Sequence, residues 1–221
     1  SMFPDDLKLA DVSPVSKNGG RNDKTNYHPV SILSVISKIY ERFMFLQISE
    51  YFSNIFSEFQ CGFRKGYSSQ CCLLRMTEKW KRCIDKQGSS GALLTDLSKA
   101  FDCLPHDLLI AKLEAYGFSY ESLKTMYSYF SNRHQRVRVN SHFSAWSEII
   151  FGAILGPLCF KIDIADLFWF ENSDLASFAD DNTPYALESD TDSVIRKLEE
   201  NSRELFEWFK MNMFKCNPGK S

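Results

Sequence analysis

Apolar and polar positions follow two different periods along this chain, and together they predict a mixture of helices and strands. Recurrence every three or four positions predicts amphipathic helices at residues 34–52, 69–86 and 192–213. Two shorter helices are expected at residues 107–116 and 119–130, and Pro157 fits the first turn of a helix over 158–170. Short apolar or alternating runs predict strands at residues 9–15, 91–96, 136–140, 144–150, 174–178 and 183–187, whereas residues 21–29 have the composition of a polar loop. The pattern predicts an α/β (α+β) fold.

In the first helix an apolar stripe recurs at helical spacing. Its members are expected to face the core: Val35, Ile39, Phe43, Met44, Ile48, Tyr51 and Phe52. In the second helix, Cys72, Met76, Trp80 and Ile84 are expected to point inward. The stripe of the first helix indicates packing against a core rather than a cofactor pocket.

Composition supports a folded chain. The 221 residues are 44% hydrophobic and 14% aromatic, which is enough to bury a substantial core and argues against intrinsic disorder. The net charge of −2 is not that of a strongly basic nucleic-acid binder. Cations nevertheless gather in two places: Arg64, Lys65, Arg75, Lys79, Lys81, Arg82 and Lys86, and then Arg133, Arg136 and Arg138. This distribution suits a template channel, and solvated helix faces also explain much of it.

The seven cysteines include no CxxC pair and no Cys/His set with zinc spacing. We therefore expect free thiols in a reducing compartment. No apolar run approaches the roughly 20 residues that a bilayer requires, and the first residues have no signal-peptide pattern. The sequence thus predicts a soluble intracellular protein, cytoplasmic or nuclear, without a membrane partner.

Asp180 and Asp181 stand at the tip of a predicted β-hairpin. Two ionised carboxylates about 4 Å apart repel by roughly 4 kcal/mol at an effective dielectric of 20, so they either point into water in a solvated turn or share a divalent cation. Asp96 ends a separate apolar strand, where its side chain would emerge at the edge of a sheet. Three such carboxylates suit Mg²⁺, and two ions together could activate a hydroxyl and stabilise a leaving pyrophosphate.

Five motifs in order carry a resemblance. They are NYHPVS at residues 26–31, QCGFRKG at 60–66, LTDLSKAFD at 94–102, ILGPL at 154–158 and FADD at 178–181. EWF at 207–209 and NPGKS at 217–221 also fit. Together they resemble the reverse transcriptases (RNA-directed DNA polymerases) of non-LTR, LINE-type retrotransposons, over roughly residues 9–221.

The resemblance implies a right-hand polymerase palm with an antiparallel sheet, plus helical fingers and no thumb. Residues 1–88 would form a fingers-like region, and residues 89–221 the palm-like region. The implied reaction is RNA-templated DNA synthesis from dNTPs by two-metal nucleotidyl transfer with Mg²⁺ or Mn²⁺, on an RNA template and a DNA primer. Asp96 and Asp180 would bind both ions, and Asp181 would assist.

Further residues acquire roles from the resemblance. Arg64, with Lys65 behind it, would contact the triphosphate, although a basic turn between two glycines is the alternative. Leu97 and Ser98 would offer backbone N–H groups to phosphate. Phe101 would lie under the nucleotide sugar and favour dNTPs, unless it is an ordinary core residue.

A second group of expectations concerns the ends of the site. Lys220 matches a lysine near the nucleotide, and Asp102 would cap a helix rather than bind metal. Arg136 and Arg138 share one face of a strand, where they could contact a nucleic-acid backbone or be solvated. His28 stands where the family usually has Arg.

The pattern departs from the family after Gly152, where a Val-Pro-Gln-Gly-Ser stretch is missing and about four residues are lost. Such a loss would displace the nucleotide, and a 1 Å misplacement can lower a rate about a hundredfold. We therefore expect weak or no activity from this chain alone. The alternatives are a catalytically inactive relic that at most binds RNA or primer–template, and another carboxylate-metal phosphotransferase or nuclease.

Overall fold

The computed structural model describes residues 2–17, 20, 22–97, 104–148, 154–170 and 174–216. Packing divides the chain into two compact units. The first comprises residues 1–50 and 106–156, and the second residues 51–105 and 157–221. The chain therefore passes from the first unit to the second and back before it returns to the second. The predicted boundary near residue 88 concerns fingers and palm, and it stays a prediction.

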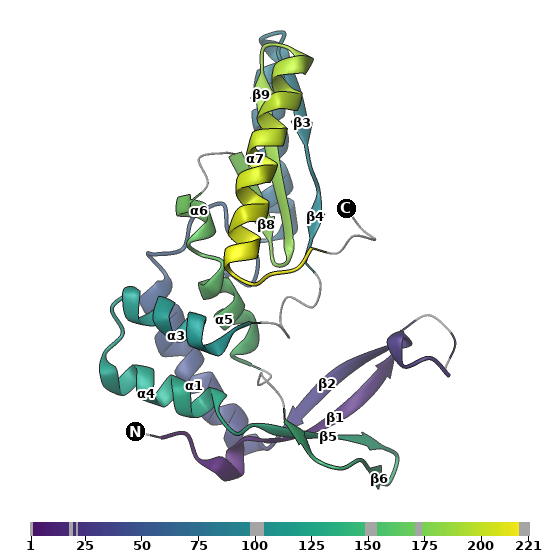
Figure 1. The fold of residues 1–221 in the computed structure, drawn as a ribbon, viewed down its shortest axis with the longest axis vertical. Helices are drawn as coiled ribbons and strands as arrows, with labels where there is room; N and C mark the ends of the chain where they lie inside the picture. Colours follow the sequence, from purple (N-terminus) through teal and green to yellow (C-terminus); the bar gives the residue numbers. More distant parts are fainter. Residues whose placement is uncertain are drawn as a thin grey trace. The chain divides into compact units, whose positions relative to one another are not determined.

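The first unit combines a mixed sheet with helices (Figure 1). Its strands are β1 (Leu9–Ser16), β2 (Tyr27–Leu33), β5 (His134–Val139), β6 (His142–Phe143) and β7 (Ser147–Glu148). Their order is β2-β1-β5-β6, with β7 also paired to β5, and β1 and β5 run parallel. Its helical segments are η1 (Asp5–Leu7), η2 (Lys24–Asn26), the part of α1 (Val35–Phe52) before residue 51, α3 (His106–Ala115) and α4 (Tyr120–Phe130).

Helix α1 has the predicted bounds, but the predicted inward stripe is wrong over its first half. Val35, Ile39 and Phe43 are 72%, 62% and 62% exposed. In the second half Ile48 and Phe52 are buried as expected, whereas Tyr51 is 47% exposed. The first half of α1 therefore turns its apolar stripe away from the core.

Polar side chains of α1 occupy the core instead. Glu41 is fully buried, and its carboxylate accepts hydrogen bonds from the Tyr129 hydroxyl at 3.0 Å and from the Ile154 backbone N–H at 2.8 Å. Arg133, 2% exposed, forms an ion pair with Glu41 at 3.4 Å. Because these long-range partners satisfy the buried carboxylate, pairing rather than hydropathy decides which face of α1 is inside.

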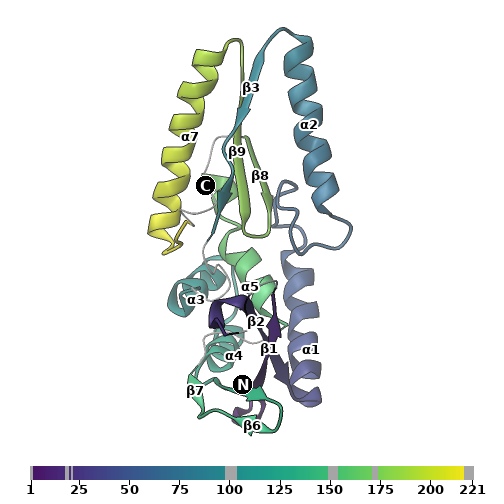
Figure 2. The ribbon, with the colours of Figure 1, turned by 90° about the vertical axis from the view of Figure 1, so that its right-hand side faces the viewer.

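The second unit is an antiparallel sheet with helices on both faces. Its strands are β3 (Ser89–Ala92), β4 (Thr95–Asp96), β8 (Asp174–Phe178) and β9 (Asp181–Glu188), and its helices are α2 (Ser69–Asp85), α5 (Gly156–Asp163), α6 (Leu167–Phe170) and α7 (Thr191–Met211). Strand β9 is central, with β8 on one side and β3 followed by β4 on the other. Figure 2 shows α7 and α2 on opposite sides of this sheet.

Most predicted elements are confirmed, with boundary changes. The polar loop predicted at 21–29 overlaps β2, which begins at Tyr27, and the helix predicted over 158–170 is split into α5 and α6. In α2, Ile84 is 58% exposed rather than inward. Of the cysteines, the six in the described part of the chain are free thiols, as predicted. No helix in the described ranges has the length and apolar content needed to cross a membrane.

Candidate active site

The predicted hairpin forms, and its register places the acidic residues. Phe178 pairs with Asp181, so Ala179 and Asp180 make a two-residue turn. The strand after the turn therefore begins at Asp181 rather than at the predicted residue 183. Ala179 has a φ of 59°, the left-handed conformation that two-residue hairpin turns require.

Asp96 lies directly opposite Asp181 in the antiparallel pair of β4 and β9. Residues directly opposite point to the same face of a sheet, with Cβ atoms about 4.5–5.5 Å apart. Asp180 immediately precedes Asp181, so all three predicted catalytic residues lie at the same end of this sheet. Like charges directly opposite destabilise a strand pair, so the arrangement points to a use other than stability.

Buried polar side chains next to the aspartates form hydrogen bonds that stabilise the turn. Asn182 is fully buried, and its side-chain N–H donates to the backbone carbonyl of Asp180 at 3.2 Å. The hydroxyl of Thr95, also buried, donates to the carbonyl of Asn182 at 2.7 Å. Neither residue was predicted to have a role from the sequence, although a polar side chain next to each aspartate was the available signal.

The loop before α2 packs against the same hairpin. Gln60 pairs with Ser177 in a parallel bridge, and the Cys61 N–H donates to the Ser177 carbonyl at 3.0 Å. A Cβ built on Gly62 would lie 2.2 Å from the backbone nitrogen of Ala179. The loop backbone therefore touches the turn that carries Asp180, and only glycine permits this approach.

Gly62→Ala is expected to lower the free energy of unfolding by about 2–3 kcal/mol, because the added methyl group forces the two backbones apart. It should also reduce any activity that depends on Asp180. Urea unfolding checks the stability, with Gly20→Ala as the control, since a Cβ at Gly20 meets nothing within 4 Å. Equal stability of Gly62→Ala and the parent chain would contradict the close packing.

The carboxylates at the hairpin turn could bind magnesium without forming a complete ligand set. Within the described ranges, no group of three or more His, Cys, Asp or Glu side chains is arranged to hold a metal ion. Mg²⁺, however, is usually held by one or two carboxylates and takes its other oxygens from water and substrate phosphates. Asp96 and its neighbours at the turn fit that mode. The three-carboxylate ligand set stays a prediction.

Arg64 lies on the loop beside the hairpin, half-buried. Its guanidinium donates to the Ser57 carbonyl at 2.7 Å and lies 4.3 Å from the centroid of the Tyr67 ring. These contacts fix the guanidinium on the loop, while Lys65 is exposed. A role for either residue in binding triphosphate stays a prediction.

Lys161 is a buried residue next to this loop, and no role was predicted for it from the sequence. It is 5% exposed, and its ammonium group lies 3.9 Å from the centroid of the Phe56 ring. Burial, together with the nearby charge of Arg64, lowers the pKa of Lys161 to about 8. The available signal was a cation, followed two residues later by Asp163, in a largely apolar stretch of residues 158–165.

Of the other predicted nucleotide-binding residues, the structure describes Leu97 alone. Leu97 is buried and pairs with Cys216 in an antiparallel bridge. Ser98, Phe101 and Lys220 lie outside the described residues, as do Asp102 and Gly152, after which a stretch was predicted to be missing.

Two other basic residues of the region before Asp96 have acidic partners. Arg75 forms an ion pair with Glu58 at 3.5 Å, and Lys79 forms one with Asp174. These two ion pairs therefore connect α2 to the loop before it and to β8. Arg75 and Lys79, two members of the first group of cations, are therefore paired rather than simply solvated.

In the first unit, Arg136 and Arg138 share one face of β5, as predicted, because both lie near the Phe143 ring, at 4.0 and 5.7 Å. Arg136 also forms an ion pair with Asp11 at 2.7 Å. Arg138 is exposed. Arg133, grouped with them from the sequence, is instead in the buried pair with Glu41, so it does not contribute to a surface patch.

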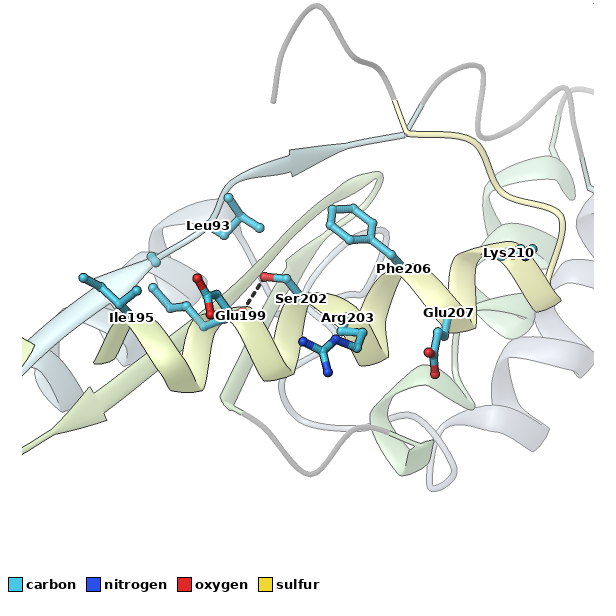
Figure 3. A pocket seen from close by; sticks show the side chains of 10 residues that line it. Leu93, Ile195, Glu199, Ser202, Arg203, Phe206, Glu207 and Lys210 are labelled. Atoms are coloured by element: carbon cyan, nitrogen blue, oxygen red, sulfur yellow. Dashed lines mark hydrogen bonds between the residues drawn. The ribbon is translucent and has the colours of Figure 1, made fainter. Parts of the chain in front are cut away.

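A groove of about 770 Å³ lies elsewhere in the second unit, between α7 and the residues that follow β3 (Figure 3). Leu93, Ile195 and Phe206 give it apolar walls. Its charged residues alternate in sign along α7: Glu199, Arg203, Glu207 and Lys210. No predicted site residue lines this groove, so it is separate from the aspartate cluster (Asp96, Asp180 and Asp181).

Comparison with known proteins shows the family of this chain. The family described as "Reverse transcriptase (RNA-dependent DNA polymerase)" matches residues 15–221. This chain is a member of the reverse transcriptase family.

Relatives narrow the type of reverse transcriptase. The "Probable RNA-directed DNA polymerase from transposon BS" of Drosophila melanogaster is 29% identical over 235 residues, covering 100% of this chain and 26% of that protein. The corresponding protein from transposon X-element of the same organism is 30% identical over 196 residues, covering 81% and 21%. This reverse transcriptase domain is therefore of the non-LTR transposon type, and it spans about a quarter of these relatives.

Solved structures share the fold of this reverse transcriptase domain. A telomerase from Candida albicans, in complex with a fragment of telomeric RNA, has a TM-score of 0.59 at 12% identity and covers 100% of this chain and 43% of its own. A telomerase from Candida tropicalis gives 0.61 at 9% identity, with 100% and 41% covered. The expected palm-and-fingers fold class is confirmed by this similarity.

Proposed function

We propose that this domain carries out RNA-templated DNA synthesis from dNTPs. The observation that carries the proposal is the placement of Asp96 opposite Asp181, next to Asp180, in a chain of the reverse transcriptase family. Like-charged partners at one end of a sheet are unfavourable by themselves, and a bound cation removes the repulsion.

The residues of the chain have distinct parts in the proposed reaction. Asp96 and Asp180 would hold magnesium, with Asp181 assisting. When bound, the metal would supply activation of the primer 3′-hydroxyl and charge stabilisation of the leaving pyrophosphate. Arg64 and Lys65 would bind the triphosphate, since guanidinium and ammonium groups both pair with phosphate oxygens. The hydroxyl oxygen loses its proton to water and forms a bond to the α-phosphorus as the bond between that phosphorus and pyrophosphate breaks.

The direct test is extension of an oligo(dT) primer on poly(rA) by the 221-residue chain, with labelled dTTP and Mg²⁺. Incorporation of dTMP that depends on the template and stops on addition of EDTA is expected. The rate is expected to be low, because the predicted loss of about four residues after Gly152 would misplace the nucleotide. Misplacement by 1 Å can lower a rate about a hundredfold. No template-dependent incorporation with either Mg²⁺ or Mn²⁺ would reject the proposal for this chain.

The structurally similar telomerase from Candida albicans was solved with a fragment of telomeric RNA. For this chain we propose an RNA template and a DNA primer as partners. Arg138, which is exposed beside Phe143 on the sheet of the first unit, would contact the nucleic-acid backbone. Such contacts weaken as salt rises, because binding releases condensed counterions.

A further inference from the structure

Lys161 contacts the loop of residues 57–66 through both its backbone and its side chain. Its backbone carbonyl accepts a hydrogen bond from the Gln60 side chain at 2.6 Å, and its ammonium lies 3.4 Å from the Phe63 carbonyl. The same ammonium lies over the Phe56 ring. One helical residue therefore holds the loop through both its main chain and its side chain.

Phe63 needs such support. Its φ is 53°, a left-handed conformation that is uncommon for a bulky aromatic residue, and its side chain is 47% exposed. Strained backbone persists only where the surroundings over-determine it. The Lys161 ammonium at the Phe63 carbonyl is a contact that does so from the buried side.

The position of Lys161 is unusual for a structural lysine. Among the residues that the structure describes, no carboxylate forms an ion pair with it, and the charged group that acts on it is the like-charged Arg64. A buried cation without an opposite charge is destabilising. A destabilising group that contacts a strained loop next to a candidate active site is more readily explained by positioning than by stability.

The loop held in this way leads to two parts of the candidate site. Gly62 touches Ala179 in the turn before Asp180, and Arg64 follows Phe63 directly. We propose that Lys161 is a positioning residue, whose ammonium holds the Phe63 carbonyl and so sets Arg64 and the Asp180 turn for the incoming dNTP. The inference rests on the proposed function. It assigns Lys161 no contact with the nucleotide.

Steady-state kinetics of primer extension tests the proposal in the 221-residue chain. Lys161→Met keeps the volume and removes the charge, and it is expected to raise the KM for dTTP about tenfold or more while kcat changes less than twofold. Lys161→Arg, which keeps the charge, is expected to restore KM to within about threefold of the parent. Lys112→Met is the matched control, because Lys112 is a buried lysine of the first unit.

Two readouts separate positioning from a purely structural role. Hydrogen exchange of the amides at residues 61–66 should speed up in Lys161→Met and not in Lys112→Met. In the parent chain kcat/KM for dTTP should fall above about pH 8, where the ammonium loses its proton, and Lys161→Met should lack that limb. Arg64 is the charged group that acts on Lys161 from the loop, while Ser177 and Ala179 of the hairpin do not titrate.

The outcomes are distinguishable. If the parent extends the primer but Lys161→Met has an unchanged KM or unchanged exchange at residues 61–66, the positioning role is rejected. If the parent does not extend the primer, the proposed function fails, and the exchange data alone then support or reject the effect of Lys161 on the loop. Should Lys161→Met not fold, Lys161→Gln, neutral and able to donate a hydrogen bond, replaces it with the same criteria.

Discussion

Asp96→Asn is expected to lower kcat/KM for dTMP incorporation about a thousandfold or more. A metal-bound carboxylate contributes several kcal/mol to transition-state stabilisation, and each 1.36 kcal/mol corresponds to a factor of ten. Asp180→Asn should have an effect of the same size, and Asp181→Asn a smaller one, since Asp181 is expected to assist rather than to hold both ions. Primer extension on poly(rA) under single-turnover conditions measures all three.

The stability of Asp96→Asn is not expected to fall with its activity. Asp96 lies opposite Asp181, so removing one of two like charges is expected to leave the free energy of unfolding unchanged or to raise it slightly. Asp192→Asn, at an exposed position in the first turn of α7, is the control: it should leave primer extension unchanged and lower the free energy of unfolding by at most about 1 kcal/mol. Near-parental extension by a folded Asp96→Asn variant would rule out the aspartate cluster as the catalytic site.

Glu41→Ala is expected to lower the free energy of unfolding by about 3–5 kcal/mol. It leaves the buried charge of Arg133 without its partner, and it removes the acceptor of the Tyr129 hydroxyl and the Ile154 N–H. Urea unfolding at pH 7 measures the change. Because the pair is buried on both sides, the effect should depend little on salt.

A double-mutant cycle tests the origin of this effect. Arg133→Met alone should also destabilise, whereas Glu41→Ala combined with Arg133→Met should destabilise by clearly less than the sum of the two single changes. Glu50→Ala, at an exposed acidic residue on the same helix, should stay within about 0.5 kcal/mol of the parent. Additivity of the two single changes would show that the ion pair carries no coupling.

The hairpin illustrates how far sequence reasoning reaches. The apolar run of β8 and the turn chemistry after it predicted a hairpin whose tip carries Asp180, and the structure has it. The prediction started the second strand two residues late, because Ala179 takes a left-handed φ that the residue type does not suggest. The packing of Gly62 on Ala179 supports this conformation, and that contact joins residues more than a hundred positions apart.

Helix α1 shows the opposite case. Its bounds follow from local periodicity, but its buried face does not, because Glu41 is inside and Ile39 is outside. A hydropathy pattern assigns a carboxylate to solvent, since an unpaired buried charge is very unfavourable. Arg133, Tyr129 and Ile154 reverse that assignment, and none of them is near Glu41 in the sequence.

The sequence by itself determined the order of helices and strands, the placement of Asp96 at a strand end and of Asp180 at a hairpin tip, and the family resemblance. These depend on backbone periodicity and local motifs, which are properties of short stretches. The tertiary structure alone decided that Asp96 faces Asp181, that Glu41 is buried, and that Lys161 supports Phe63. Register and the pairing of buried charges depend on partners distant in the chain, and no local pattern encodes which partners meet.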